Sequence, residues 1–85
     1  SRLTASDVGE LQIWAKTVLE VSDNVTLLRL KKDTLDVLSL LGARWREAGN
    51  YYPYVMTDYR HSLQERIEYE SERLRLIEAK IGTKN

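Results

Sequence analysis

Apolar residues recur at helical spacing along the last third of the chain, where two columns of side chains can be followed over several turns. The columns are Ile67, Leu74 and Ile81, and Met56, Leu63 and Ile77. Steps of three and four residues place both columns on one face of an α-helix. The pattern predicts a helix from about Tyr52 to Ile81, with Pro53 in its first turn and Gly82 after its end.

Polar residues also fall on or beside this apolar face. Arg60 and Glu70 occupy seam positions, where polar groups either fix the pairing of helices or lie with their stems packed and their heads in solvent. Glu70 and Arg73, and likewise Glu72 and Arg75, are opposite charges three residues apart. Such pairs favour the helix by a few tenths of a kcal/mol each.

The first half of the chain has a longer and less regular apolar pattern. Thr4 and Asp7 have the spacing of a capping box, which predicts a helix start. An apolar seam then continues through Leu11, Trp14, Val18, Val21, Val25 and Leu28. Residues 22–24 are weak helix formers that favour helix starts, as does Asp33. The stretch predicts either a helix break between Ser22 and Thr34 or one continuous helix.

Between Leu27 and Trp45 apolar side chains occupy more than one helix face, which is typical of a helix with two neighbours. The tightest stripe consists of Leu35, Leu38, Gly42 and Trp45. Gly49 is predicted to end this helix in the left-handed conformation. The short connection to the next helix makes the two helices antiparallel neighbours.

These elements predict an all-α fold with a single helical-bundle domain over residues 1–85. An unbroken helix from Thr4 to Ala48 would be about 67 Å long and would overhang a partner of about 45 Å. The chain therefore forms either a three-helix antiparallel bundle, which we favour, or a long two-helix hairpin that associates with another copy. Because the sequence opens on Ser1 without a methionine, we interpret it as a fragment of a larger protein.

Composition narrows the classes of function. The 13 basic and 13 acidic residues balance, which argues against a nucleic-acid or membrane-surface partner. No cysteine is present, so disulfides and thiolate metal sites are excluded. No apolar run approaches the ~20 residues of a membrane span, and no signal peptide precedes the first helix. We expect a soluble, cytoplasmic protein.

A possible metal site is formed by Asp58, His61 and Glu65, which share one helical face. Di-iron helical bundles use a similar carboxylate and histidine pair twice, together with further glutamates. Here the pair occurs once, His61 is the only histidine, and Leu63 rather than His61 faces the seam. We predict a solvated polar face, with no metal and no cofactor.

Most of the aromatic residues gather around the predicted turn: Trp45, Tyr51, Tyr52, Tyr54 and Tyr59, with Met56 among them. Tyrosine and tryptophan combine a large contact area with a polar group, which favours them at binding surfaces. The cluster is either a cap that closes the end of the bundle or a contact site for a partner. The three closely spaced tyrosines cannot all point inward, so at least one is predicted to be exposed.

Residues from Leu28 to Arg60, among them Asp36, Arg44, Pro53 and Asp58, make about a third of the chain look like the all-helical chorismate mutases. The resemblance implies an enzyme in which Arg29, Arg44 and Arg60 grip the carboxylates of the substrate. The family's lysine between the second arginine and the proline is missing here, as is its later glutamine-bearing helix. The run from Leu11 to Trp14 is also similar to the first helix of spectrin repeats.

Taken together, the sequence predicts a non-enzymatic helical module for protein–protein interaction or oligomerisation. The module would bury an apolar helix face against either a second copy or a partner helix. Such a module would act as a coiled-coil-like scaffold, with a homodimer as the simplest form. The predicted interface residues are Leu11, Trp14, Val18, Leu28, Leu38, Trp45, Tyr51, Tyr52 and Tyr54. Glutamate at Leu28 or Leu38 is expected to abolish folding or assembly.

Overall fold

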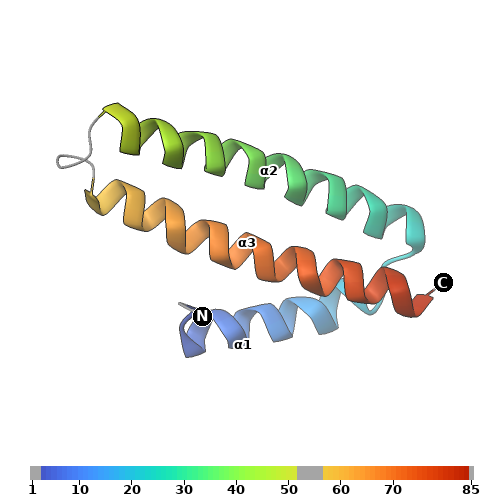
Figure 1. Cartoon of the computed structure of the whole chain (residues 1–85). Helices are drawn as coiled ribbons and strands as arrows, with labels where there is room; N and C mark the ends of the chain where they lie inside the picture. The colour runs from blue at the N-terminus through green and yellow to red at the C-terminus, as the bar shows by residue number, and fades with distance from the viewer. Residues whose placement is uncertain (1–2, 52–56, 85) are drawn as a thin grey trace.

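The computed structural model describes residues 3–51 and 57–84, and these residues form an all-α bundle without a strand. The described elements are α1 (Ala5–Trp14), the π-helix η1 (Ala15–Leu19), α2 (Asn24–Tyr51) and α3 (Thr57–Lys84). Helix α3 lies between the other two, antiparallel to α2 and parallel to α1 (Figure 1). The molecule is a flat body of 45 × 26 × 15 Å. The predicted all-α bundle is confirmed, in its three-helix form.

Helix α1 begins at the predicted capping box. The backbone N–H of Asp7 donates to Oγ1 of Thr4, and the backbone N–H of Thr4 donates to Oδ2 of Asp7, both at 3.1 Å. Two N–H groups that the first helical turn leaves without partners are thereby satisfied. Leu3 and Val8 flank this cap and line one groove beside α1.

The end of the first helix widens into the π-helix η1, in which the N–H of Glu20 donates to the carbonyl of Ala15 at 3.0 Å. Eight residues of α-helix would carry Leu19 about 80° around the axis from Leu11. The wider π turn rotates each residue by less, so both leucines are buried, each 2% exposed. The predicted seam is therefore wrong beyond Val18: Val18 is half-buried, whereas Val21 is 79% and Val25 69% exposed.

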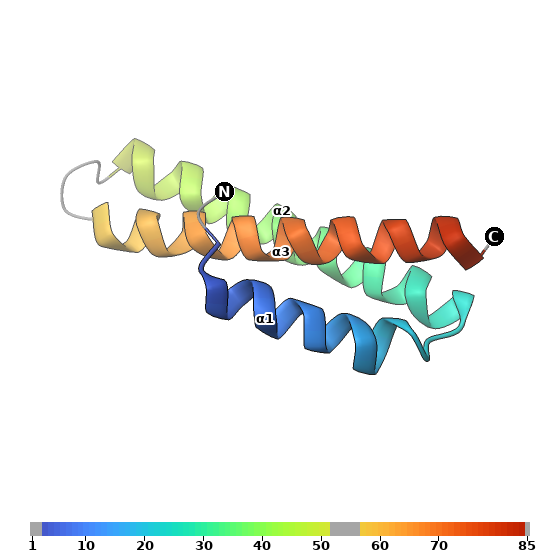
Figure 2. The ribbon, with the colours of Figure 1, turned by 90° about the horizontal axis from the view of Figure 1, so that it is seen from below.

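The chain breaks immediately after η1, within the range that the sequence predicts. Asp23 precedes α2, and its Oδ1 accepts a hydrogen bond of 2.8 Å from the N–H of Thr26. The Ser22 hydroxyl donates back to the carbonyl of Val18 at 2.6 Å. Each side chain satisfies a backbone group that a helix end leaves open. The break lets α2 fold back along α3 (Figures 1 and 2).

Packing is densest at the end of the molecule where η1, the start of α2 and the last third of α3 meet. Leu19, Leu27 and Ile77 form the buried cluster there, with Trp14 and Leu30 packed against it. Leu63 of the predicted seam is also buried. None of the described helices combines the length and the apolar composition needed to cross a lipid bilayer.

The helix ends near the turn differ from the sequence prediction. Gly49 lies inside α2 and Gly82 lies inside α3, and no described glycine has a positive φ. The predicted start at Tyr52 falls outside the described residues. Gly49 serves close approach instead, because a Cβ there would lie 2.6 Å from Cζ of Arg60. Gly49 was thus correctly predicted to be a special position, but the reason is its close approach to Arg60 and not a left-handed backbone conformation.

Candidate interaction surfaces

Polar and cationic groups add to the apolar contacts that hold α1 and the segment after it on α3. The Tyr69 hydroxyl donates to Oε1 of Glu10 at 2.8 Å, and the guanidinium of Arg73 lies 4.4 Å from the ring centroid of Trp14. Lys80 pairs with Glu20 at 3.4 Å. Burial and the hydrogen bond to Glu10 raise the pKa of Tyr69 above its ordinary value of 10.0. The hydrogen bond from Tyr69 to Glu10 therefore requires the protonated phenol.

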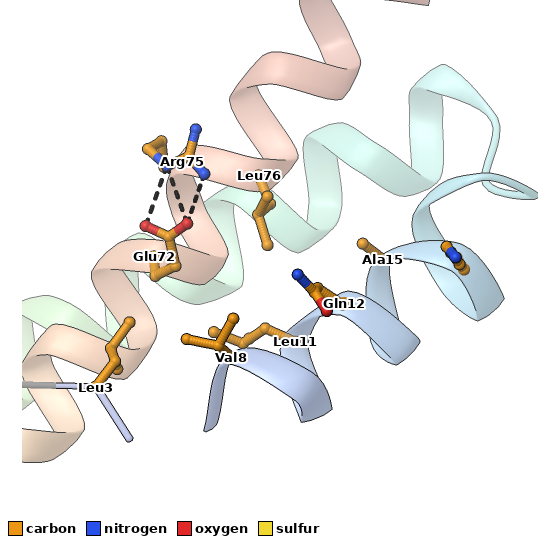
Figure 3. Close-up of a pocket in the computed structure, with 9 residues that line it drawn as sticks. Leu3, Val8, Leu11, Gln12, Ala15, Glu72, Arg75 and Leu76 are labelled. Atoms are coloured by element: carbon orange, nitrogen blue, oxygen red, sulfur yellow. Dashed lines mark hydrogen bonds and ion pairs between the residues drawn. The ribbon is translucent and has the colours of Figure 1, made fainter. Parts of the chain in front are cut away.

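A groove of about 550 Å³ runs between α1 and α3 (Figure 3). Its lining consists of Leu3, Val8, Leu11, Gln12, Ala15, Lys16, Glu72, Arg75 and Leu76. In Figure 3, Val8 and Leu76 point into it from the two helices, and the Glu72–Arg75 pair stands beside it. The aliphatic lining suits apolar side chains, and none of the lining residues is a nucleophile paired with a base.

The ion pair at this groove, like the one between Glu70 and Arg73, forms where the sequence predicts it. Nη2 of Arg75 lies 2.6 Å from Oε1 of Glu72, and Nε donates to both carboxylate oxygens at 3.0 Å. These hydrogen bonds lower the pKa of Glu72 and raise that of Arg75. Arg73 and Glu70 lie 3.8 Å apart.

Glu70 confirms its predicted seam position, since it is 3% exposed at the centre of α3. Its Oε2 lies 2.8 Å from Nη2 of Arg66. Removing a carboxylate from water costs several kcal/mol, which an ion pair of this kind offsets only in part. The contact keeps the charge balanced inside the bundle and creates no reactive centre.

The candidate metal ligands do not come together. His61 and Glu65 approach to 2.8 Å between Nε2 and Oε1, but Asp58 stays exposed, and no three His, Asp or Glu residues of the described chain are grouped for a metal ion. A smaller polar hollow of about 230 Å³ includes Glu65 and lies where α1 begins beside α3. The face is occupied by ion pairs on the helix surface.

The arginines suggested by the enzyme resemblance do not converge either. Arg60 is engaged with Trp45: its guanidinium lies 4.0 Å from the ring centroid, and its Nε donates to the Trp45 carbonyl at 3.3 Å. Arg29 precedes Trp45 by sixteen residues on the same helix, about 24 Å along the axis. A small dicarboxylate cannot bridge that distance.

Helix α2 carries a column of apolar residues that α1 and α3 leave partly exposed. Leu28 is 57% and Leu35 43% exposed, while Leu38 and Gly42 are half-buried beside them. We call these four residues the outer flank of α2. Leu28, Leu35 and Gly42 are spaced by seven residues, which aligns them in one column over two successive double turns.

The side of this flank follows from the contacts with α3. Lys31, between Leu28 and Leu35, pairs with Glu78 at 3.6 Å. Glu78 lies five residues beyond Arg73, about 140° around α3 from the residue that contacts Trp14 of α1. The outer flank therefore faces away from α1. Counting inward from the Lys31–Glu78 and Gly49–Arg60 contacts, Leu35 lies level with Leu74 and Gly42 with Ile67.

The predicted interface residues differ in how far their own chain buries them. Leu11 is 2% exposed and already covered by its own chain, so it offers no free surface. Trp14, Val18, Leu38 and Trp45 are half-buried, and Leu28 is open. Tyr51 ends the described part of α2, and nothing is described of its side chain; Tyr52 and Tyr54 lie outside the described residues.

Leu35 and Gly42 belong to this surface although neither is among the individually predicted interface residues. The seven-residue spacing from Leu28 was the signal for them, and Leu38 and Trp45 of the same stripe were predicted at the interface. Comparison with protein-family models, with curated proteins and with solved structures found no match. The geometry of the described residues is therefore the basis for any functional proposal.

Proposed function

We propose that this chain is a helical interaction module that self-associates by burying the outer flank of α2. The observation that carries the proposal is the exposure of Leu28 and Leu35 in one column of a well-formed helix. Apolar side chains aligned along a helix are the elements that helix pairing uses. Removing these apolar side chains from water is favourable by about 25 cal/mol per Å² of surface buried.

The accessible area of the chain supports the same proposal. A compact monomer of 9.9 kDa exposes about 5,200 Å², whereas this chain exposes 6009 Å². The excess of roughly 800 Å² is about the area that each partner buries in a standard protein–protein interface. In the flat arrangement α3 lies between its two neighbours, and each outer helix keeps one side open (Figures 1 and 2).

The first test is molar mass in solution across a concentration range by sedimentation equilibrium. We expect the wild-type chain to rise from 9.9 kDa toward twice that mass. Leu28→Glu is expected to remain monomeric with unchanged helix content by circular dichroism, because its side chain is open to solvent in the single chain.

The matched control is Leu40→Glu. Leu40 is 51% exposed, a fraction similar to that of Leu28, but its side chain lies about 120° away from Leu28 around α2. It should leave self-association unchanged. A wild-type chain that stays monomeric into the millimolar range overturns the proposal, and a loss of association with Leu40→Glu moves the interface to another side of α2.

A further inference from the structure

We infer that two copies pair through antiparallel α2 helices related by a two-fold axis at Leu35, with Leu28 of each copy seated over Gly42 of the other. The inference rests on the proposed self-association and specifies its partner and geometry. The outer flank is self-complementary about Leu35: a large side chain lies seven residues before it, and a residue without a side chain lies seven residues after it.

Two-fold pairing requires that if one residue contacts a second across the interface, the second contacts the first. With Leu35 on the axis, Leu28 meets Gly42 twice, once on each side. A Cβ at Gly42 would have only Nη1 of Arg46 nearby, at 3.5 Å. Arg46 is exposed and its long side chain is free to swing aside, so the position above Gly42 accepts a leucine as a knob enters a hole.

Charges next to the flank are compatible with the same direction. Lys32 and Asp36 are 77% and 68% exposed, pair with each other at 3.3 Å, and lie on either side of the proposed axis. Antiparallel pairing brings each Lys32 toward the Asp36 of the second copy. Parallel pairing in register would instead leave Gly42 opposite Gly42, which creates an unfilled gap.

The neighbouring helix completes the surface that the second copy would contact. Leu74 and Ile67 of α3 are half-buried and lie level with Leu35 and Gly42. A second α2 placed over the flank therefore also covers these two side chains. The resulting core would be formed by two α2–α3 hairpins, while α1 of each copy stays on the far side.

The direction of pairing can be measured with spin labels, because the natural chain has no cysteine. Single cysteines can be introduced at Ser39, Ala43 and Asn50, three exposed positions that lie along one side of α2. Antiparallel pairing about Leu35 separates the two labels along the axis by about 12, 24 and 45 Å, about 3 Å for every residue from the axis. Equal distances at all three sites would establish parallel pairing and overturn the inference.

The fit of Leu28 over Gly42 is tested by exchange of the large and small residues. Gly42→Leu fills the hole and should raise the dimer dissociation constant by about tenfold or more, although leucine favours the helix. Adding Leu28→Ala should restore association to within about threefold, because the knob and the hole then exchange places. Gly82→Leu is the matched control, since a Cβ at Gly82 meets nothing within 4 Å.

The outcomes separate the inference from the proposed function. A wild-type chain that stays monomeric removes both. A dimer that tolerates Gly42→Leu, or one that the double variant fails to rescue, keeps the self-association but overturns this geometry. A dimer with the graded label distances and with rescue by exchange supports both.

Discussion

At the scale of single residues, the absence of a side chain at Gly49 leaves the space that the guanidinium of Arg60 occupies. The guanidinium of Arg60 lies over Gly49 and reaches the ring and the carbonyl of Trp45. This contact joins the end of α2 to the beginning of α3. It also explains why Arg60, at a seam position, does not extend its charged group into solvent.

A double-mutant cycle tests this contact. Alanine in place of glycine inside a helix stabilises by about 1 kcal/mol, so Gly49→Ala should stabilise the chain in an Arg60→Ala background. With Arg60 present, the new Cβ displaces the guanidinium, and the loss of its contacts with Trp45, about 1 kcal/mol, should cancel or reverse the gain.

The measurement for this cycle is the free energy of unfolding in urea for all four combinations. A coupling of about 1 kcal/mol between the two positions is expected. If Gly49→Ala stabilises both backgrounds equally, Arg60 does not hold the place described for it.

At the scale of elements, the hydrogen bond between Tyr69 and Glu10 links α1 to α3. The raised pKa of Tyr69 means that the folded state holds the phenolic proton more tightly than the unfolded state does. This contribution to stability is fully present below the unfolded pKa of about 10 and is lost as the pH rises through the higher, folded pKa.

Tyr69→Phe should flatten this alkaline decline, because phenylalanine has no proton to lose and makes no hydrogen bond to Glu10. The measurement is the free energy of unfolding between about pH 8 and 11.5. Tyr59→Phe, at a side chain that is 41% exposed, should keep the wild-type decline. An unchanged slope in Tyr69→Phe would show that the phenol does not link α1 docking to pH.

At the scale of the whole molecule, two adjacent leucines divide the work of folding and association. Leu27 is 0% exposed and belongs to the core cluster, whereas Leu28 is 57% exposed on the outer flank. The sequence predicts that glutamate at Leu28 abolishes folding or assembly. Because Leu28 is exposed in the single chain, we expect the substitution to affect assembly and not folding. The side chains of Leu27 and Leu28 point about 100° apart around α2.

Leu27→Ala should destabilise the chain by about 2–5 kcal/mol, because it leaves a cavity beside Leu19 and Ile77. Leu28→Ala should lower the stability of the monomer by less than about 1 kcal/mol, while it weakens self-association. Thermal unfolding at low concentration measures the first effect, and sedimentation measures the second. Equal losses of monomer stability would contradict this division.

The chain's sequence by itself determined the features that depend on neighbouring residues. The Thr4 and Asp7 cap, the charge pairs along α3 and the antiparallel α2–α3 pairing all follow from interactions within a few positions or from a short connection. Such interactions form wherever the local sequence permits them, so their patterns can be recognised without knowing the fold.

Only the tertiary structure decided which apolar side chains are covered. The π-helix turns Leu19 into the core in place of the next seam residue, Arg60 makes use of the space at Gly49, and α3 covers Leu27 but leaves Leu28 and Leu35 open. Each outcome depends on packing between segments distant in the sequence. Burial is a property of the assembled surface, and a pattern of apolar residues identifies the faces that require cover without specifying what covers them.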